Sequence, residues 1–141
     1  MATSSIRTYS NQQTPRSSLE RALAAAQVAF ENRGQDIVIL DMREVTPVFD
    51  YFVLVTGGGS RRHLHAISDD IDNSLEGELG DHRIGIEGYQ ESRWVLLDYG
   101  DVVIHIFAPE CREYYDIEQL WCEAKRVEFE PKHCPNLRVS E

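Results

Sequence analysis

The 141-residue sequence is poor in cysteine and in basic residues. Its three cysteines, Cys111, Cys122 and Cys134, form no C-x-x-C pair. An odd, scattered set does not favour a disulfide framework or a zinc site, and it indicates a reducing compartment. Fourteen Lys and Arg against 24 Asp and Glu give a formal net charge of −10. Because non-specific nucleic-acid binding needs a basic surface, we expect no strong direct binding to nucleic acid; the charge suits a basic partner.

The sequence also lacks long apolar runs. No stretch approaches the roughly 18 apolar residues of a membrane-spanning helix, so we expect no membrane association. Residues 1–16 lack the apolar core of a secretory signal and contain two arginines and no acid. We expect them to be a disordered extension of a cytoplasmic protein. The alternative is a transit peptide, which would place the protein in an organellar matrix or stroma.

The rest of the sequence predicts one domain, residues 17–129, followed by a loose polar tail, residues 130–141. Ser17 and Glu20 have the spacing of a capping box, which predicts a helix that ends near Gly34. The expected apolar face of this helix is Leu19, Leu23, Ala26 and Phe30. Strands are expected at 36–42 and 50–56, followed by a helix after Ser60. A short strand is expected at 83–87 with Ile84 and Ile86 inward, followed by a hairpin at 93–107 and a helical segment from Pro109 through Trp121. This order indicates an α/β (α+β) fold, a mixed sheet of about five strands with helices packed on it.

The hairpin at 93–107 is the most informative segment. Gly100 and Asp101 suit a two-residue type II′ turn, which fixes the register of the two strands. One face is then aliphatic and is expected to be core: Val95, Leu97, Tyr99, Val102, Ile104 and Ile106. The opposite face, called here the mixed face, carries aromatic, acidic and imidazole groups: Trp94, Leu96, Asp98, Val103, His105 and Phe107.

The mixed face allows two interpretations. Aromatic anchors beside polar groups are typical of protein interfaces, whereas buried polar groups would each need a partner. We therefore interpret the mixed face as a contact surface. The alternative is that a helix covers it and that His105 is a hydrogen-bonded core histidine.

Enzymatic alternatives have less support in the sequence. Nucleotidyl transfer would use the glycine run before Ser60 to hold phosphates, and two carboxylates on one strand face to bind metal ions. The position two residues after Asp98 is Gly100, so the carboxylate pair is missing. The glycine run also lacks the G-x-x-x-x-G-K-[ST] pattern. We expect no catalytic residues, no cofactor and no metal site.

The sequence resembles the ribosomal silencing factor family (RsfS, also called Iojap) from about Leu19 to Trp121. The matching pieces are Gln35-Asp36-Ile37-Val38, Leu40-Asp41, Asp50-Tyr51-Phe52, Thr56-Gly57, Ser60-Arg61, Glu87-Gly88, Trp94, Asp98-Tyr99-Gly100-Asp101-Val102, His105, Arg112, Tyr115 and Glu118-Gln119-Leu120-Trp121. Gly59 and His63 depart from the commoner family pattern.

The resemblance implies a nucleotidyltransferase-like topology without catalytic carboxylates. It also implies binding to the large ribosomal subunit through ribosomal protein L-fourteen, a steric block of subunit association, lowered translation when nutrients are scarce, and a homodimer. Within this picture Trp94, Leu96 and Phe107 are expected to be apolar anchors, and Asp98 and His105 to set polar register. The expected supporting or contacting residues are Tyr99, Arg112 and Tyr115. The alternatives are a large-subunit assembly factor and a residual nucleotide-dependent transferase.

Overall fold

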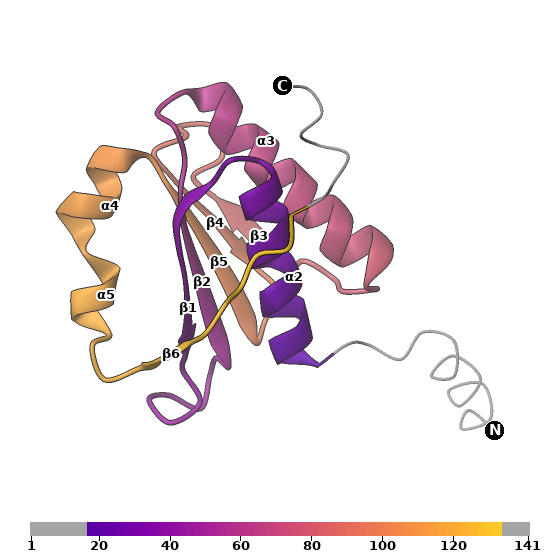
Figure 1. The fold of residues 1–141 in the computed structure, drawn as a ribbon, viewed down its shortest axis with the longest axis vertical. Coiled ribbons are helices and arrows are strands. Elements are labelled where there is room, and N and C mark those ends of the chain that lie inside the picture. The colour runs from indigo at the N-terminus through magenta and orange to yellow at the C-terminus, as the bar shows by residue number, and fades with distance from the viewer. Residues whose placement is uncertain (1–16, 134–141) are drawn as a thin grey trace.

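The computed structural model describes residues 17–133, which form one mixed sheet with helices on both of its faces (Figure 1). The helices are α2 (Ser18–Glu31), α3 (Arg61–Asp72), α4 (Pro109–Tyr115) and α5 (Ile117–Leu120), and a π-helical turn (Asn73–Glu78) extends α3. The strands are β1 (Gln35–Asp41), β2 (Tyr51–Thr56), β3 (Gly85–Glu87), β4 (Trp94–Asp98), β5 (Val102–Phe107) and β6 (Lys125–Val127).

The six strands lie in the order β3-β4-β5-β2-β1-β6. β2 and β5 are parallel and every other described pair is antiparallel. All six residues of β2 and all six of β5 are buried, because these two strands are central and covered on both faces. The mixed α+β fold is therefore confirmed, and β6 is a strand that the sequence did not predict.

Helices α2 and α3 cover one face of the sheet (Figure 1). The capping box at Ser17 and the side-chain cap at Ser60 are both present, so both helices begin where the sequence predicted. The buried face of α2 is the predicted one only in part. Ala26 is fully buried and Leu23 packs against the core, as expected, whereas Leu19 is exposed. The other buried apolar residues of α2 are Ala22, Ala25 and Ala29.

The other face is covered only in part, by α4 and α5. The helical segment expected from Pro109 through Trp121 is present as two short helices, because the chain turns at Asp116, whose φ of 46° is left-handed. The two short helices bury Cys111 and Ile117 against the sheet, and Trp121 packs beside them. They cover the β5 side of the mixed face. The turn at Asp116 between them therefore affects which part of the mixed face remains exposed.

One other expectation, an inward-facing Ile84, is wrong. Ile84 precedes β3 and is 66% exposed, while Ile86 alone packs against the core. The chain also stays on the domain past residue 130. The side-chain amide of Gln27 and the backbone of Lys132 make two hydrogen bonds, of 2.8 and 2.9 Å. The His133 ring meets the Phe30 ring edge-on. Residues 1–16 and 134–141 lie outside the described range.

Candidate functional site

The hairpin has the predicted register. Trp94 pairs with Phe107, Leu96 with His105 and Asp98 with Val103. Gly100 has the positive φ, 92°, that the turn requires, and the Tyr99 N–H donates to the Val102 carbonyl oxygen at 2.9 Å. The aliphatic face lies in the core beneath α2 and α3, as expected.

The mixed face is divided between the core and the surface. On β5, Phe107 is fully buried, and His105 and Val103 are 5% and 3% exposed. On β4, Trp94, Leu96 and Asp98 are half-buried. Helical segments thus cover β5, as the second interpretation expected, whereas β4 keeps part of its side chains accessible, and its role as a contact surface stays a prediction. Phe107 has no exposed surface and His105 very little, so the structure does not support their direct contact with a partner as anchor and polar group.

An exposed aromatic group extends the accessible part of β4 onto α4. The Trp94 and Tyr115 rings lie 4.9 Å apart, and Tyr114 meets Tyr115 edge-on at 4.8 Å. Tyr114 is 78% exposed and Tyr115 49%. Together with Leu96, two residues along the same face of β4, these residues form what we call the Trp94 surface: Trp94, Leu96, Tyr114 and Tyr115. Clustered aromatic side chains of this kind are typical anchors of protein interfaces.

Tyr114 is the member of the Trp94 surface that the sequence analysis missed. The signal was present as two consecutive tyrosines, Tyr114 and Tyr115, in a predicted helical segment. Phe52, which contacts the rings of His105 and Trp121 from β2, was read only as a strand residue. Its role depends on β2 and β5 being neighbours, which no local pattern shows.

Two other predicted site residues, Arg112 and Tyr99, make hydrogen bonds that join elements of the fold. The Arg112 guanidinium donates to Thr56 Oγ1 and to the Asp36 carbonyl oxygen, each at 2.8 Å, and pairs with Glu118 at 3.2 Å. It thereby ties α4 and α5 to the sheet. Tyr99 lies on the aliphatic face, 4% exposed, and donates from its hydroxyl to Asp72 at 2.6 Å. Burial, together with this bond, raises the pKa of Tyr99.

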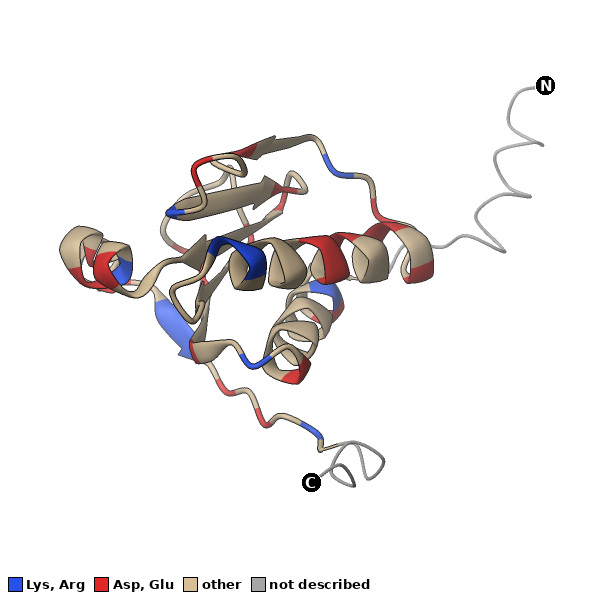
Figure 2. Cartoon of the chain, turned by 90° about the horizontal axis from the view of Figure 1, so that it is seen from above, with Lys and Arg blue, Asp and Glu red and all other residues tan. Residues whose placement is uncertain are grey.

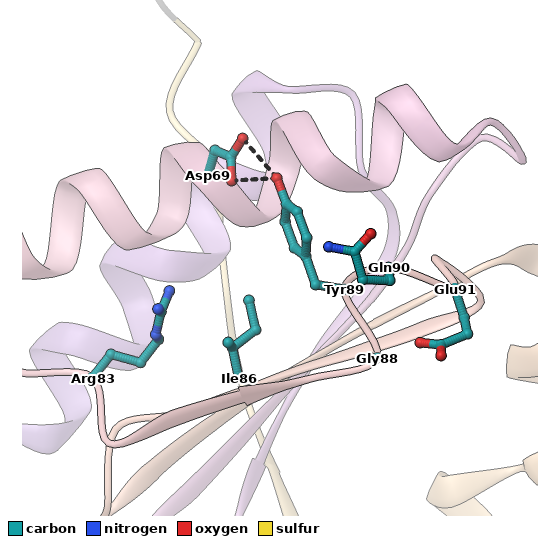
Figure 3. A pocket seen from close by; sticks show the side chains of 7 residues that line it. All are labelled: Asp69, Arg83, Ile86, Gly88, Tyr89, Gln90 and Glu91. Atoms are coloured by element: carbon teal, nitrogen blue, oxygen red, sulfur yellow. Dashed lines mark hydrogen bonds between the residues drawn. The ribbon is translucent and has the colours of Figure 1, made fainter.

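The loop that leads into Trp94 is attached to α3 (Figure 3). The Tyr89 hydroxyl donates to Asp69, and the Tyr89 ring stacks on His65 at 3.8 Å. His65 Nε2 lies 2.7 Å from the Tyr89 carbonyl oxygen and 2.8 Å from Ser92 Oγ. A hollow of about 490 Å³ lies between this loop, Ile86 and α3. These contacts fix the chain two residues before Trp94.

The groups that a nucleotidyl transferase would use are engaged elsewhere. Asp98 Oδ1 accepts the Gly100 N–H at 2.8 Å, and Asp101 pairs with Arg21 at 2.7 Å. In the glycine run, the Gly58 N–H donates to His63 Nδ1 at 2.7 Å. The Gly58 amide, which could otherwise face a phosphate, therefore already has a hydrogen-bond acceptor within the chain. That acceptor is His63, which departs from the common family pattern.

Charge is unevenly placed on the described surface. Acidic residues are concentrated in the later part of α3 and in the turn after it, at Asp69, Asp70, Asp72, Glu76 and Glu78. Figure 2 marks acidic positions along the ribbon in red. None of the helices within residues 17–133 is both long and apolar enough to cross a membrane.

Comparison with known proteins agrees with this geometry. A family model described as "Ribosomal silencing factor during starvation" matches residues 15–140. The Ribosomal silencing factor RsfS of Bacillus subtilis is 39% identical over 106 residues, which cover 75% of this chain and 88% of the relative. The mouse protein "Mitochondrial assembly of ribosomal large subunit protein 1" is 33% identical over 93 residues, 64% of this chain and 40% of that protein.

Solved structures show the same fold. A crystal structure of a Chromobacterium violaceum protein is similar with a TM-score of 0.71 and 32% identity, covering 83% of this chain and 95% of that one. The family match spans the whole described domain, including the hairpin and the helices beside it. The chain thus belongs to the ribosomal silencing factor family.

Proposed function

We propose that this protein binds the large ribosomal subunit through ribosomal protein L-fourteen and sterically blocks subunit association, so that translation falls when nutrients are limiting. The observation that carries the proposal is the Trp94 surface, where exposed aromatic side chains lie on rigid elements. The family supports a ribosome-related regulatory role, and the surface supports contact with a protein. The action is binding rather than catalysis.

The contact would use Trp94, Leu96 and Tyr115, with Tyr114 at its rim and Asp98 as a neighbouring polar group. A standard interface buries about 800 Å² on each partner, and truncation of a central aromatic anchor costs about 2 kcal/mol or more. The surface is fixed by Arg112 below α4 and by the Tyr89 loop before β4. A pre-formed surface loses less conformational entropy on binding than a mobile one.

A subunit-joining assay tests the blocking step. Purified large subunits are incubated with the protein, small subunits are added, and joined ribosomes are measured by light scattering. The proposal predicts fewer joined ribosomes with the wild-type protein and normal joining with Trp94→Ala. Normal joining in the presence of bound wild-type protein would contradict the blocking step.

A role in large-subunit assembly is the second candidate, and the printed name of the mouse relative favours it. It predicts that deletion of the gene accumulates precursor particles while subunit joining in the purified assay is unaffected. The resemblance also supports a homodimer, which sedimentation velocity of the free protein would test. Cell fractionation would test whether the protein is cytoplasmic or organellar.

A further inference from the structure

The imidazole of His105 is part of the core, in contact with the indole of Trp94. It is 5% exposed and lies between two phenyl rings. The Phe52 ring meets it edge-on at 4.8 Å, and the Phe107 ring is stacked with it at 6.0 Å. The centroid of the Trp94 ring is also 6.0 Å away. The residue was expected at the partner contact, but it lies one layer below it.

A hydrogen bond joins the two side chains. The Trp94 indole N–H donates to His105 Nδ1 at 3.1 Å. An indole nitrogen can only donate, so Nδ1 is the unprotonated acceptor and the proton of the neutral ring lies on Nε2. Burial, with the charge of Arg112 as the second cause, lowers the pKa of His105 to about 4. The ring therefore remains a neutral acceptor near pH 7.

The other ring nitrogen has no hydrogen-bond partner among residues 17–133, although it is buried. A buried donor without a partner destabilises a fold, and an apolar side chain at this place would avoid the loss. Position 105 is thus occupied by a residue that is not the best choice for stability. What the imidazole supplies, and an aliphatic side chain would not, is the acceptor for the indole of Trp94.

We propose that His105 is a positioning residue, which holds the Trp94 indole in its binding orientation and does not itself touch the partner. The proposal rests on the proposed function of the Trp94 surface. Phe107 and Tyr115 flank the indole at 5.1 and 4.9 Å but limit its rotation only by packing. The hydrogen bond also fixes the direction in which the indole N–H points, so the Trp94 side chain loses less conformational freedom when a partner docks.

Two variants of similar size separate positioning from packing. Asn at position 105 can place its carbonyl oxygen near the site of Nδ1, whereas Leu has the same branching and no acceptor. We expect His105→Leu to unfold at the same temperature as the wild type or higher, yet to bind purified large subunits about tenfold more weakly. His105→Asn should recover most of the affinity. Equal affinity of wild type and His105→Leu, or an equal loss in both variants, would overturn the proposal.

The indole N–H signal in a nitrogen-15 NMR spectrum gives a readout that needs no ribosome. The signal of Trp94 should shift and exchange with solvent about tenfold faster in His105→Leu, and remain near its wild-type position in His105→Asn. The indole of Trp121, the second tryptophan, is the internal reference. If the wild type does not bind large subunits but this signal responds, the proposed function fails and the positioning role stands. An unchanged Trp94 signal in His105→Leu overturns the positioning role.

Discussion

Arg21, Tyr99 and His105 are among the described residues that combine deep burial with a polar or charged group. Arg21 is 7% exposed and its guanidinium pairs with both Asp81 and Asp101 at 2.7 Å. Tyr99 donates to Asp72. These bonds join α2, the turn after α3 and the tip of the hairpin, so polar groups inside the core also fix the positions of the elements around it.

Removing the Arg21 guanidinium should destabilise the fold strongly. Arg21→Met keeps much of the apolar stem but leaves Asp81, whose side chain is 12% exposed, without this charge partner. We expect the free energy of unfolding to fall by about 3 kcal/mol, measured by urea denaturation. Arg43→Met, which removes a pair whose arginine is 59% exposed, is the control and should have no measurable effect. Equal effects of the two would contradict the structural role of Arg21.

The burial of His105 predicts how stability depends on pH. Well above pH 6.5 the imidazole is neutral in both folded and unfolded chains. As the pH falls below 6.5, the unfolded chain binds a proton at this site, but the folded chain does so only near the lowered pKa of about 4. The free energy of unfolding therefore falls toward acid pH, by up to about 3 kcal/mol from this group.

His105→Leu removes this component, so its stability should decrease less than that of the wild type between pH 6.5 and pH 4. The measurement is a series of urea titrations of both proteins across that range. Parallel pH profiles of the two proteins would show that His105 is not held neutral in the folded state.

At the scale of elements, the connection from β3 to β4 requires a glycine. Gly88 has a φ of 77°, and a Cβ there would collide with the carbonyl oxygen of Trp94. Gly88→Ala should lower the free energy of unfolding by about 2 kcal/mol or more and displace the backbone of the central contact residue. Gly77→Ala is the matched control, since that glycine has no positive φ and open space around it.

The readouts for this pair are thermal unfolding and binding to large subunits. Gly88→Ala should lose both stability and binding. Gly77→Ala should keep binding and unfold at the same temperature or slightly higher, because alanine restricts the unfolded chain. A Gly88→Ala protein with wild-type stability would show that the connection tolerates a side chain.

The elements differ in how far the sequence predicts them. The hairpin register follows from the turn at Gly100 and from the alternation of successive strand side chains between the two faces of the sheet. Both are local features, and the register is confirmed. The break at Asp116 was missed because aspartate tolerates left-handed φ without a distinctive pattern around it. Strand β6 was missed because it is three residues long and is a strand only through its pairing with β1.

At the scale of the whole molecule, the sequence predicted which side chains share a face of the sheet at the candidate site, but not which of them reach solvent. Alternation places Trp94, His105 and Phe107 on one side of the sheet, and the structure does so. Which of them reaches solvent depends on α4 and α5, which return over β5 and leave β4 partly open. The partners of Arg21, Asp81 and Asp101, lie 60 and 80 residues away in the sequence, a distance that no local pattern covers.

Binding to purified large ribosomal subunits tests whether the Trp94 surface is the contact with the ribosome. Co-sedimentation is measured for the wild type, for Trp94→Ala, and for Val48→Ala as the control, since Val48 is a 64% exposed apolar residue in the loop between β1 and β2. We expect the wild type and Val48→Ala to sediment with large subunits, and folded Trp94→Ala to bind at least about thirtyfold more weakly. Undiminished binding by folded Trp94→Ala would contradict this prediction.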